Sequence, residues 1–225
     1  MADHFRVPRV LLDSLIQRQG QTLFRWRSFL PLALVPAALV ALADSTPIDY
    51  WFGETAEDVW IGFSMLVAYL GLAVRVMTVG FVPGRTSGRN TSEQRADSLN
   101  TTGMYSVVRN PLYLGNFLTL LGFAMMTMVW WFVVLVVLSF ALYYERIILT
   151  EEDILRGKFG AVYEAWASKT PVFFPRLALW RRPEWKFSLR AVLRREHVGL
   201  YLIAVVSTLI EAGVELLGEG ETLYS

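Results

Sequence analysis

Two separated polar stretches hold the residue types in this chain that could do chemistry. The first contains Arg109, and the second contains Arg146, Glu151 and Glu152. A guanidinium group can hold a carboxylate or a phosphate through two parallel hydrogen bonds. A carboxylate can neutralise an organic cation, or can accept a proton from a reacting amine. These residue types make Arg109, Arg146 and Glu151 the catalytic candidates.

Composition limits the chemistry further. The chain contains no Cys and two His residues, His4 and His197. Thiolate nucleophiles, disulfides, Cys-ligated metals and His-rich metal sites are therefore excluded, and no metal site is predicted. The remaining candidates are carboxylates, Arg, Tyr, Asn, backbone groups and a bound cofactor.

An apolar run separates the two polar stretches. It extends over 38 residues from Leu112 to Leu149. One membrane-spanning helix needs about 20 residues, so this run fits two helices and a tight turn. Two spans return the chain to the side that it left. Arg109, Arg146 and Glu151 are therefore expected on the same face of a bilayer.

The whole chain has the composition of an integral membrane protein. Of its 225 residues, 54% are hydrophobic and only 18% are charged, and its mean hydropathy is +0.41. A soluble domain is about 25% charged. The expected fold is an all-α polytopic membrane protein with about five transmembrane helices and additional cytoplasmic interfacial helices. The predicted elements are a basic amphipathic helix at 5–27, spans at 28–43, 59–79 and 197–217, and the hairpin at about 112–149.

The charges are distributed unequally between the loops. The loop at 44–58 contains acidic residues and no Lys or Arg, whereas 1–27, 80–109 and 150–196 are rich in Arg. The positive-inside rule places these three basic segments, and with them the site, in the cytoplasm. The net charge of +1 gives no reason to expect nucleic acid as a partner. The first span ends in Ala41-Leu42-Ala43, which resembles a signal-peptidase site, but we expect this span to be retained.

A third pattern follows the hairpin. Apolar residues recur at spacings of three and four through residues 151–168, from Leu155 to Trp166. This spacing predicts an amphipathic helix that lies along the cytoplasmic surface and ends before Pro171. The segment Phe173-Phe174-Pro175 is expected to insert an apolar wedge at the interface.

Taken together, these motifs resemble one family of membrane enzymes. They are LNTTGMY at 99–105, RNPLYLG at 109–115, EEDILRGKFG at 151–160, Tyr163, Trp166 and a Pro-rich end at 171–175. The order and the hairpin spacing resemble the isoprenylcysteine carboxyl methyltransferase and phospholipid methyltransferase family. Its pattern is Arg-His-Pro-x-Tyr-x-Gly, a helical hairpin, Glu-Glu-x-x-Leu-x-x-x-Phe-Gly-x-x-Tyr and a Pro-rich segment. The resemblance covers about 99–175.

The resemblance implies S-adenosylmethionine as the cofactor and methyl transfer to a lipid-like acceptor. The residues implied to line the cofactor pocket are Tyr105, Val108, Asn110, Pro111, Tyr113, Gly115 and Glu152, with Glu151 as an alternative to Glu152. The chain departs from the pattern at Asn110, where the family has His. An amide can donate and accept hydrogen bonds but cannot titrate, so a role that requires imidazole protonation is in doubt.

Several functions remain open at this level. The favoured one is O-methylation of a carboxylate or phosphate, since Arg109 and Arg146 could hold an anion. N-methylation of a phospholipid amine, with Glu151 or Glu152 as base, is an alternative. An NADPH-dependent reductase of the sterol type and a non-catalytic lipid-binding relative are further alternatives. The acceptor could be a prenylated cysteine, a phospholipid amine, a lipid phosphate or a small hydrophobic molecule.

Each candidate residue also has a purely structural interpretation. Arg109 and Arg146 could anchor helix ends at the membrane surface. Asn110 and Pro111 suit the N-cap and first turn of a helix, and Gly115 suits close helix packing. Tyr105 and Tyr113 could be interfacial aromatics, and Glu151-Glu152 could be the solvated first turn of a surface helix.

Three regions are expected along the chain. Residues 1–98 hold the amphipathic segment and the first two spans. Residues 99–180 form the cofactor-binding core, and residues 181–225 form a basic connector and the C-terminal membrane helix. The oligomeric state is not predicted.

Overall fold

The computed structural model describes residues 29–45, 53–82 and 98–218. The amphipathic helix predicted at 5–27 lies outside these residues. The described residues form helices and connecting turns, without a strand, which confirms the all-α fold. The elements are η1 (Leu30–Leu34), α2 (Val35–Ala43), α4 (Glu54–Gly80), α5 (Met104–Val107), α6 (Pro111–Met126), α7 (Trp130–Phe159), α8 (Ala161–Ala167), η2 (Leu177–Leu179) and α9 (Leu189–Gly218).

The predicted hairpin is confirmed as α6 and α7. The two helices are joined by residues 127–129, where Met128 has a φ of 58°. The Thr127 hydroxyl donates to the Ala124 carbonyl at 2.8 Å and accepts from the Val129 amide at 3.4 Å. The side chain therefore satisfies backbone groups that the end of α6 and the start of α7 leave without helical partners.

Three of the five predicted spans are long enough to cross a bilayer. The candidates are α4, α7 and the segment Leu189–Val214 of α9. The first apolar segment, Pro31–Ala43, and α6 are shorter. At about 1.5 Å per residue they reach about 20 and 24 Å, less than the ~30 Å hydrocarbon thickness. The described residues thus contain three helices long enough to span a membrane and two shorter apolar ones, and the predicted count of about five spans is not confirmed.

The surface helix predicted at 151–168 is wrong in its boundaries. Helix α7 continues without interruption from Trp130 to Phe159. The break comes at Gly160, whose φ of 51° ends α7 and starts α8. No proline interrupts the chain between Leu149 and Phe159, so the membrane helix simply extends into the polar segment. Glu151 and Glu152 therefore lie within a long helix and not in a first turn.

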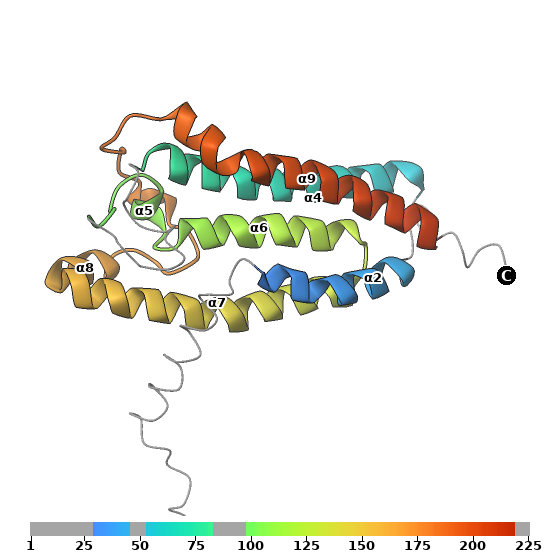
Figure 1. Ribbon diagram of the computed structural model, residues 1–225, viewed down its shortest axis with the longest axis horizontal. Coiled ribbons are helices and arrows are strands. Elements are labelled where there is room, and N and C mark those ends of the chain that lie inside the picture. The colour runs from blue at the N-terminus through green and yellow to red at the C-terminus, as the bar shows by residue number, and fades with distance from the viewer. Residues whose placement is uncertain (1–28, 46–52, 83–97, 219–225) are drawn as a thin grey trace, which may run out of the picture.

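Helix α6 lies in the middle of the bundle, between the pair α4 and α9 and the helix α7 (Figure 1). Glycines allow α4 and α6 to approach closely. A Cβ atom on Gly71 of α4 would lie 2.5 Å from the Gly115 carbonyl of α6, and one on Gly122 would lie 2.6 Å from the Ser64 carbonyl. Small residues at such crossings are typical of helix pairs in membranes.

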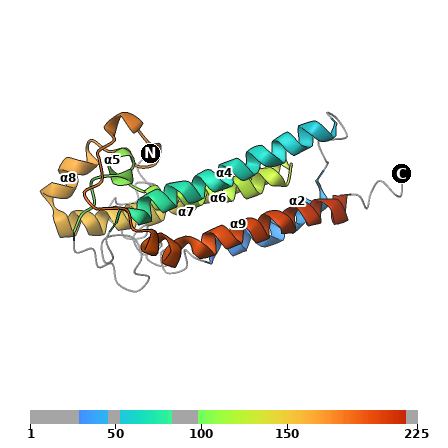
Figure 2. The ribbon, with the colours of Figure 1, turned by 90° about the horizontal axis from the view of Figure 1, so that it is seen from above.

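Helix α9 packs antiparallel to α4. The Ser188 amide donates to the Gly80 carbonyl at 2.8 Å, so the start of α9 meets the end of α4. The ring of Phe187 packs edge-on against Phe81 at 5.2 Å between centroids. This end of the bundle also carries α5 and α8 (Figure 2).

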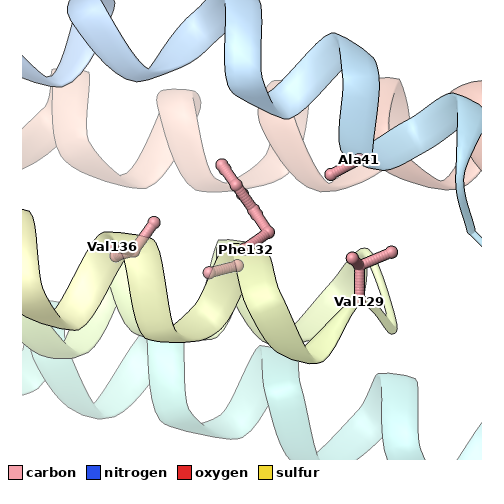
Figure 3. Packing of buried hydrophobic residues seen from close by; sticks show 5 residues of the cluster. Ala41, Val129, Phe132 and Val136 are labelled. Carbon is pink, nitrogen blue, oxygen red and sulfur yellow. The ribbon is translucent and has the colours of Figure 1, made fainter.

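The opposite end holds the hairpin turn. Ala41 of α2 packs in a buried cluster with Val129, Phe132 and Val136 at the start of α7 (Figure 3). The Trp131 indole donates to the Asp44 carboxylate at 2.7 Å. An indole that is apolar at one side and hydrogen-bonded at the other is typical of a membrane–water interface.

Candidate functional site

The site lies where α5, α6, α7 and α8 meet at one end of the bundle. Residues 168–188 connect α8 to α9, and we call them the strap. The strap runs back over α5 and is held there by backbone hydrogen bonds. These are Arg109 amide to Pro171 carbonyl at 2.8 Å, Arg176 amide to Val107 carbonyl at 2.9 Å and Gly103 amide to Arg181 carbonyl at 3.0 Å. The Trp166 indole of α8 donates to the Tyr105 carbonyl at 3.0 Å. The strap therefore fixes the short segment that carries Arg109.

Arg109 and Glu152 form an ion pair across this junction. Arg109 Nη1 lies 2.9 Å from Glu152 Oε2, and their side chains are only 15% and 13% exposed. The two predicted polar stretches, 43 positions apart, thus come into direct contact. Arg109 Nε and Glu152 Oε1 are also buried, and neither has a hydrogen-bond partner among the described residues. The pair therefore retains one donor and one acceptor for a ligand.

Tyr163 of α8 lies against this ion pair. Its side chain is fully buried, and its hydroxyl lies close to both Arg109 and Glu152 without forming a hydrogen bond of good geometry to either. Burial, aided by the nearby Glu152 carboxylate, raises the pKa of Tyr163 to about 12, although Arg109 acts in the opposite direction. Tyr163 is therefore a neutral phenol at physiological pH.

Glu151 is held by a second contact between α6 and α7. The Tyr113 hydroxyl donates to Glu151 Oε1 at 2.8 Å. The Tyr113 ring packs edge-on against Tyr144 of α7 at 4.9 Å between centroids. The Tyr113–Glu151 contact thus lies next to the Arg109–Glu152 pair. We call the five residues of this region the junction cluster: Arg109, Tyr113, Glu151, Glu152 and Tyr163.

Asn110 occupies the N-cap position of α6, and Pro111 is the first residue of that helix. The Asn110 side chain makes no capping hydrogen bond. Its amide instead donates to the Val172 carbonyl of the strap at 3.2 Å. The amide that replaces the family's His therefore ties α6 to the strap, and Pro111 is buried at the start of α6.

Two other predicted cofactor residues have packing roles in the structure. Val108 is fully buried in a cluster with Val107 and Leu114. A Cβ on Gly115 would lie 2.5 Å from Arg75 Cγ, so the glycine lets α4 and its Arg75 side chain approach α6.

Arg146 does not join Arg109. Its Nη1 donates to the Leu142 carbonyl, one turn earlier in α7, at 2.7 Å. At about 100° per residue, position 146 points about 140° away from position 151 around the helix axis. Of the three predicted catalytic residues, Arg109 and Glu151 belong to the junction cluster. Arg146 lies on another face of α7.

A cavity of about 470 Å³ adjoins the junction cluster. Tyr105 and Tyr113 line it, together with residues that the sequence analysis did not single out: Arg75, Asn116, Arg195 and Glu196. A volume of this size is within the range of small-molecule sites. Of these residues, Arg75 lies inside the span predicted at 59–79. An ionisable residue inside a membrane span is itself a sign of function, and this sign could have identified it.

Comparisons with known proteins found a matching family model and similar proteins. The phospholipid methyltransferase family model matches residues 58–162, which include most of α4, the hairpin and all of the junction cluster except Tyr163. A nickel-cobalt-cadmium resistance protein, NccN, of Alcaligenes xylosoxydans xylosoxydans is 34% identical over 172 residues, which are 76% of this chain and 71% of that protein. A cobalt-zinc-cadmium resistance protein, CzcN, of Cupriavidus metallidurans is 34% identical over 131 residues, 58% of this chain and 56% of that protein. No solved structure matches. In the described residues, no group of three or more His, Cys, Asp or Glu side chains is placed to hold a metal ion.

Proposed function

This chain belongs to the phospholipid methyltransferase family, the isoprenylcysteine carboxyl methyltransferase-like enzymes, and we propose that it transfers a methyl group from S-adenosylmethionine to a lipid-like acceptor. The proposed acceptor atom is an anionic oxygen of a carboxylate or phosphate. The proposed site is the junction cluster with the adjoining cavity. We also propose that residues 99–180 are the cofactor-binding core, which the two preceding spans and the C-terminal helix support.

One observation supports the cofactor most directly. The Arg109–Glu152 pair holds a buried donor, Arg109 Nε, and a buried acceptor, Glu152 Oε1, that have no partner among the described residues. Buried polar groups without partners are costly, and a ligand that pairs with them removes this cost. S-adenosylmethionine has an amino-acid head with one ammonium and one carboxylate. The ammonium suits Glu152, and the carboxylate suits Arg109.

The other members of the cluster have complementary roles in this proposal. Tyr113 and Tyr105 present aromatic surface to the cavity, where a sulfonium cation is stabilised by the electron-rich face of a ring. Glu151, fixed by the Tyr113 hydroxyl, adds negative potential on the same side. Both Arg109 Nε and Glu152 Oε1 are covered in this structure, so binding requires a small movement of their side chains.

The reaction requires alignment and little acid–base chemistry. An anionic oxygen attacks the methyl carbon as the carbon–sulfur bond breaks, and a carbon–oxygen bond forms. The negative charge of the oxygen and the positive charge of the sulfonium are both neutralised, and no proton is released. Such a step gains most from fixed orientation and from the exclusion of water. An amine acceptor would lose a proton, and Glu151 would then serve as its base.

The test is methyl transfer in isolated membranes. Membranes that contain the protein, or its Glu151→Gln variant, are incubated with S-adenosylmethionine that carries a trideuterated methyl group. Mass spectrometry of the extract then identifies labelled amphiphiles. We expect a labelled carboxylate ester or phosphate ester with the wild-type protein alone. A labelled amine would favour N-methylation, and no labelled species in either membrane would contradict the proposal.

A relationship to metal tolerance can be tested with the same variants. The names of the two relatives associate them with resistance to cobalt, cadmium and, respectively, nickel or zinc. We propose that any such tolerance conferred by this chain depends on methyl transfer to a membrane component. Cells that produce the Glu151→Gln variant should then grow in cobalt or cadmium no better than cells without the protein. If the variant confers the same tolerance as the wild-type protein, metal tolerance does not depend on this site.

A further inference from the structure

The cavity beside the junction cluster contains a charged group of its own. Residues of α4, α6, α7 and α9 form most of its lining, and α9 lies outside the residues that the family model matches. This group consists of the ion pair between Arg75 on α4 and Glu196 on α9, together with the neutral amide of Asn116 on α6. Three helices thus bring polar side chains to one point, near the end of α4 and the beginning of α9.

The contacts within this group are well defined. Arg75 Nε donates to Glu196 Oε2 at 2.7 Å, and Arg75 Nη2 donates to Glu196 Oε1 at 3.0 Å. Arg75 Nη1 donates to the Asn116 side-chain oxygen. The Glu196 side chain is only 4% exposed and that of Arg75 is 24% exposed. These contacts engage one N–H on each of the three guanidinium nitrogens and leave the second N–H of both terminal nitrogens for a ligand.

Attachment of α9 to α4 does not require this ion pair. The Ser188–Gly80 hydrogen bond and the Phe187–Phe81 contact already hold the start of α9. Burial of an ion pair also costs desolvation, and apolar residues of similar volume would pack as well. A role in ligand binding accounts for these charged side chains at the wall of a cavity.

The charges of the lining predict the sign of the ligand. Arg75 and Arg195 both line the cavity, against the single carboxylate of Glu196. The excess positive charge favours an anionic group. The rest of the wall is largely apolar, with Leu72, Leu120, Phe123, Leu202 and Ile203 among its residues. A ligand that matches both features has an anionic head and an alkyl chain.

We propose that this cavity is the acceptor subsite, and that Arg75 and Arg195 hold the carboxylate or phosphate head of an amphiphile whose chain lies along the apolar wall. The acceptor role rests on the methyl transfer proposed above, whereas the binding of an anionic amphiphile does not. Tyr113 and Asn116 both line the cavity, one turn apart on α6. These two positions are about 4.5 Å apart along the axis of α6, so the proposed head-group site and the junction cluster lie on neighbouring turns of this helix.

A single introduced cysteine makes this binding measurable, because the chain has no Cys of its own. Thr119 lines the cavity, and Thr119→Cys preserves its size. The rate at which methyl methanethiosulfonate modifies this cysteine is measured in detergent, without S-adenosylmethionine. The probes are octyl phosphate, octanoate, octanol and octyltrimethylammonium. Leu209→Cys, on the exposed part of α9, reports general partitioning into the micelle.

We expect octyl phosphate and octanoate to slow the modification of the thiol at position 119 saturably, and to leave the thiol at position 209 unaffected. Octanol and octyltrimethylammonium should protect much less. The stronger of the two anionic probes then indicates whether the natural head is a phosphate or a carboxylate. If the thiol at position 119 does not react in the free protein, Leu202→Cys, which also lines the cavity, gives the same measurement.

Two neighbouring arginines provide the matched control. Arg195 lines the cavity, whereas Arg194 is exposed outside it. Arg195→Gln should raise the half-protecting concentration of octyl phosphate by about tenfold, as expected for one charge-assisted hydrogen bond, and Arg194→Gln should leave it unchanged. Equal protection by the cationic or neutral probe, no protection by the anions, or equal effects of the two arginine variants would overturn the proposal. If the anions protect the thiol but the protein does not bind S-adenosylmethionine, the proposed anion-binding site stands and the proposed methyltransferase function is contradicted.

Discussion

At the scale of single residues, the account depends on the contacts that Arg109, Tyr113, Glu151 and Glu152 make across the junction. The sequence analysis identified these four from residue type and motif order. It could not predict which carboxylate pairs with which partner, because Glu151 and Glu152 are adjacent and point about 100° apart on the helix. The structure directs Glu151 to the Tyr113 hydroxyl and Glu152 to Arg109.

Glu151→Gln should abolish methyl transfer and leave folding unchanged. The glutamine side chain still accepts the hydrogen bond from the Tyr113 hydroxyl, but it removes the negative charge next to the proposed sulfonium site. Asp153→Asn, an exposed carboxylate two positions later, is the matched control. Activity is measured by label transfer, and folding by thermal unfolding in detergent. Full activity in the Glu151 variant would exclude this carboxylate from the reaction.

The pKa of Tyr163 gives a prediction in alkaline solution. A phenol whose pKa rises from 10.0 to about 12 on folding binds its proton more tightly in the folded state. Its contribution to stability is complete below pH 10 and is lost as the pH rises from 10 to about 12. Tyr163→Phe, which removes a buried hydroxyl without a described partner, should therefore reduce the loss of thermal stability over this interval. An identical pH dependence in both proteins would show that Tyr163 does not titrate in this way.

At the scale of helices, the sequence predicted the hairpin and the long spans because uninterrupted apolar runs measure length directly. It misplaced the end of α7, because the apolar run ends at Leu149 whereas the helix continues to Phe159. Hydropathy indicates where a helix stops being apolar and does not indicate where it ends. It also could not predict the cavity. The side chains of Arg75, Asn116 and Glu196 come from three helices, and only the packing of α4, α6 and α9 brings them together.

The close packing of α4 on α6 leads to a paired test. Gly71→Ala places a Cβ 2.5 Å from the Gly115 carbonyl and 2.6 Å from the Thr119 amide nitrogen, so the helices must move apart. Gly62 lies in the same helix with nothing within 4 Å of its Cβ position, and Gly62→Ala should stabilise by about 0.5–1 kcal/mol through helix propensity. We expect a lower thermal midpoint for Gly71→Ala alone. Equal midpoints would contradict the close approach.

At the scale of the whole molecule, the two ends of the bundle differ in charge. The end with the junction cluster carries Arg109, Arg156, Lys158 and the basic strap, whereas the end with the hairpin turn carries Asp44 and Glu54. This asymmetry was visible in the sequence, because the positive-inside rule requires only the order of spans and charges. We therefore expect the junction cluster on the cytoplasmic side of the membrane.

Introduced cysteines test this orientation in intact cells. Lys158→Cys lies near the end of α7, and Glu54→Cys lies at the start of α4, at the opposite end of the bundle. A membrane-impermeant maleimide should label position 54 in intact cells and position 158 only after the cells are opened. For a bacterium with an outer membrane, spheroplasts are used. The reverse pattern would place the site outside the cytoplasm.

The most direct test of the account is a calorimetric titration of the purified protein in detergent with S-adenosylmethionine. The account predicts saturable binding with one site per chain. Glu152→Gln should weaken it by at least about tenfold through loss of one charge-assisted contact, and the exposed control Glu164→Gln should not weaken it. The absence of binding heat at several temperatures, in protein whose helical circular dichroism shows that it is folded, would contradict the central claim that the two distant polar stretches form one cofactor site.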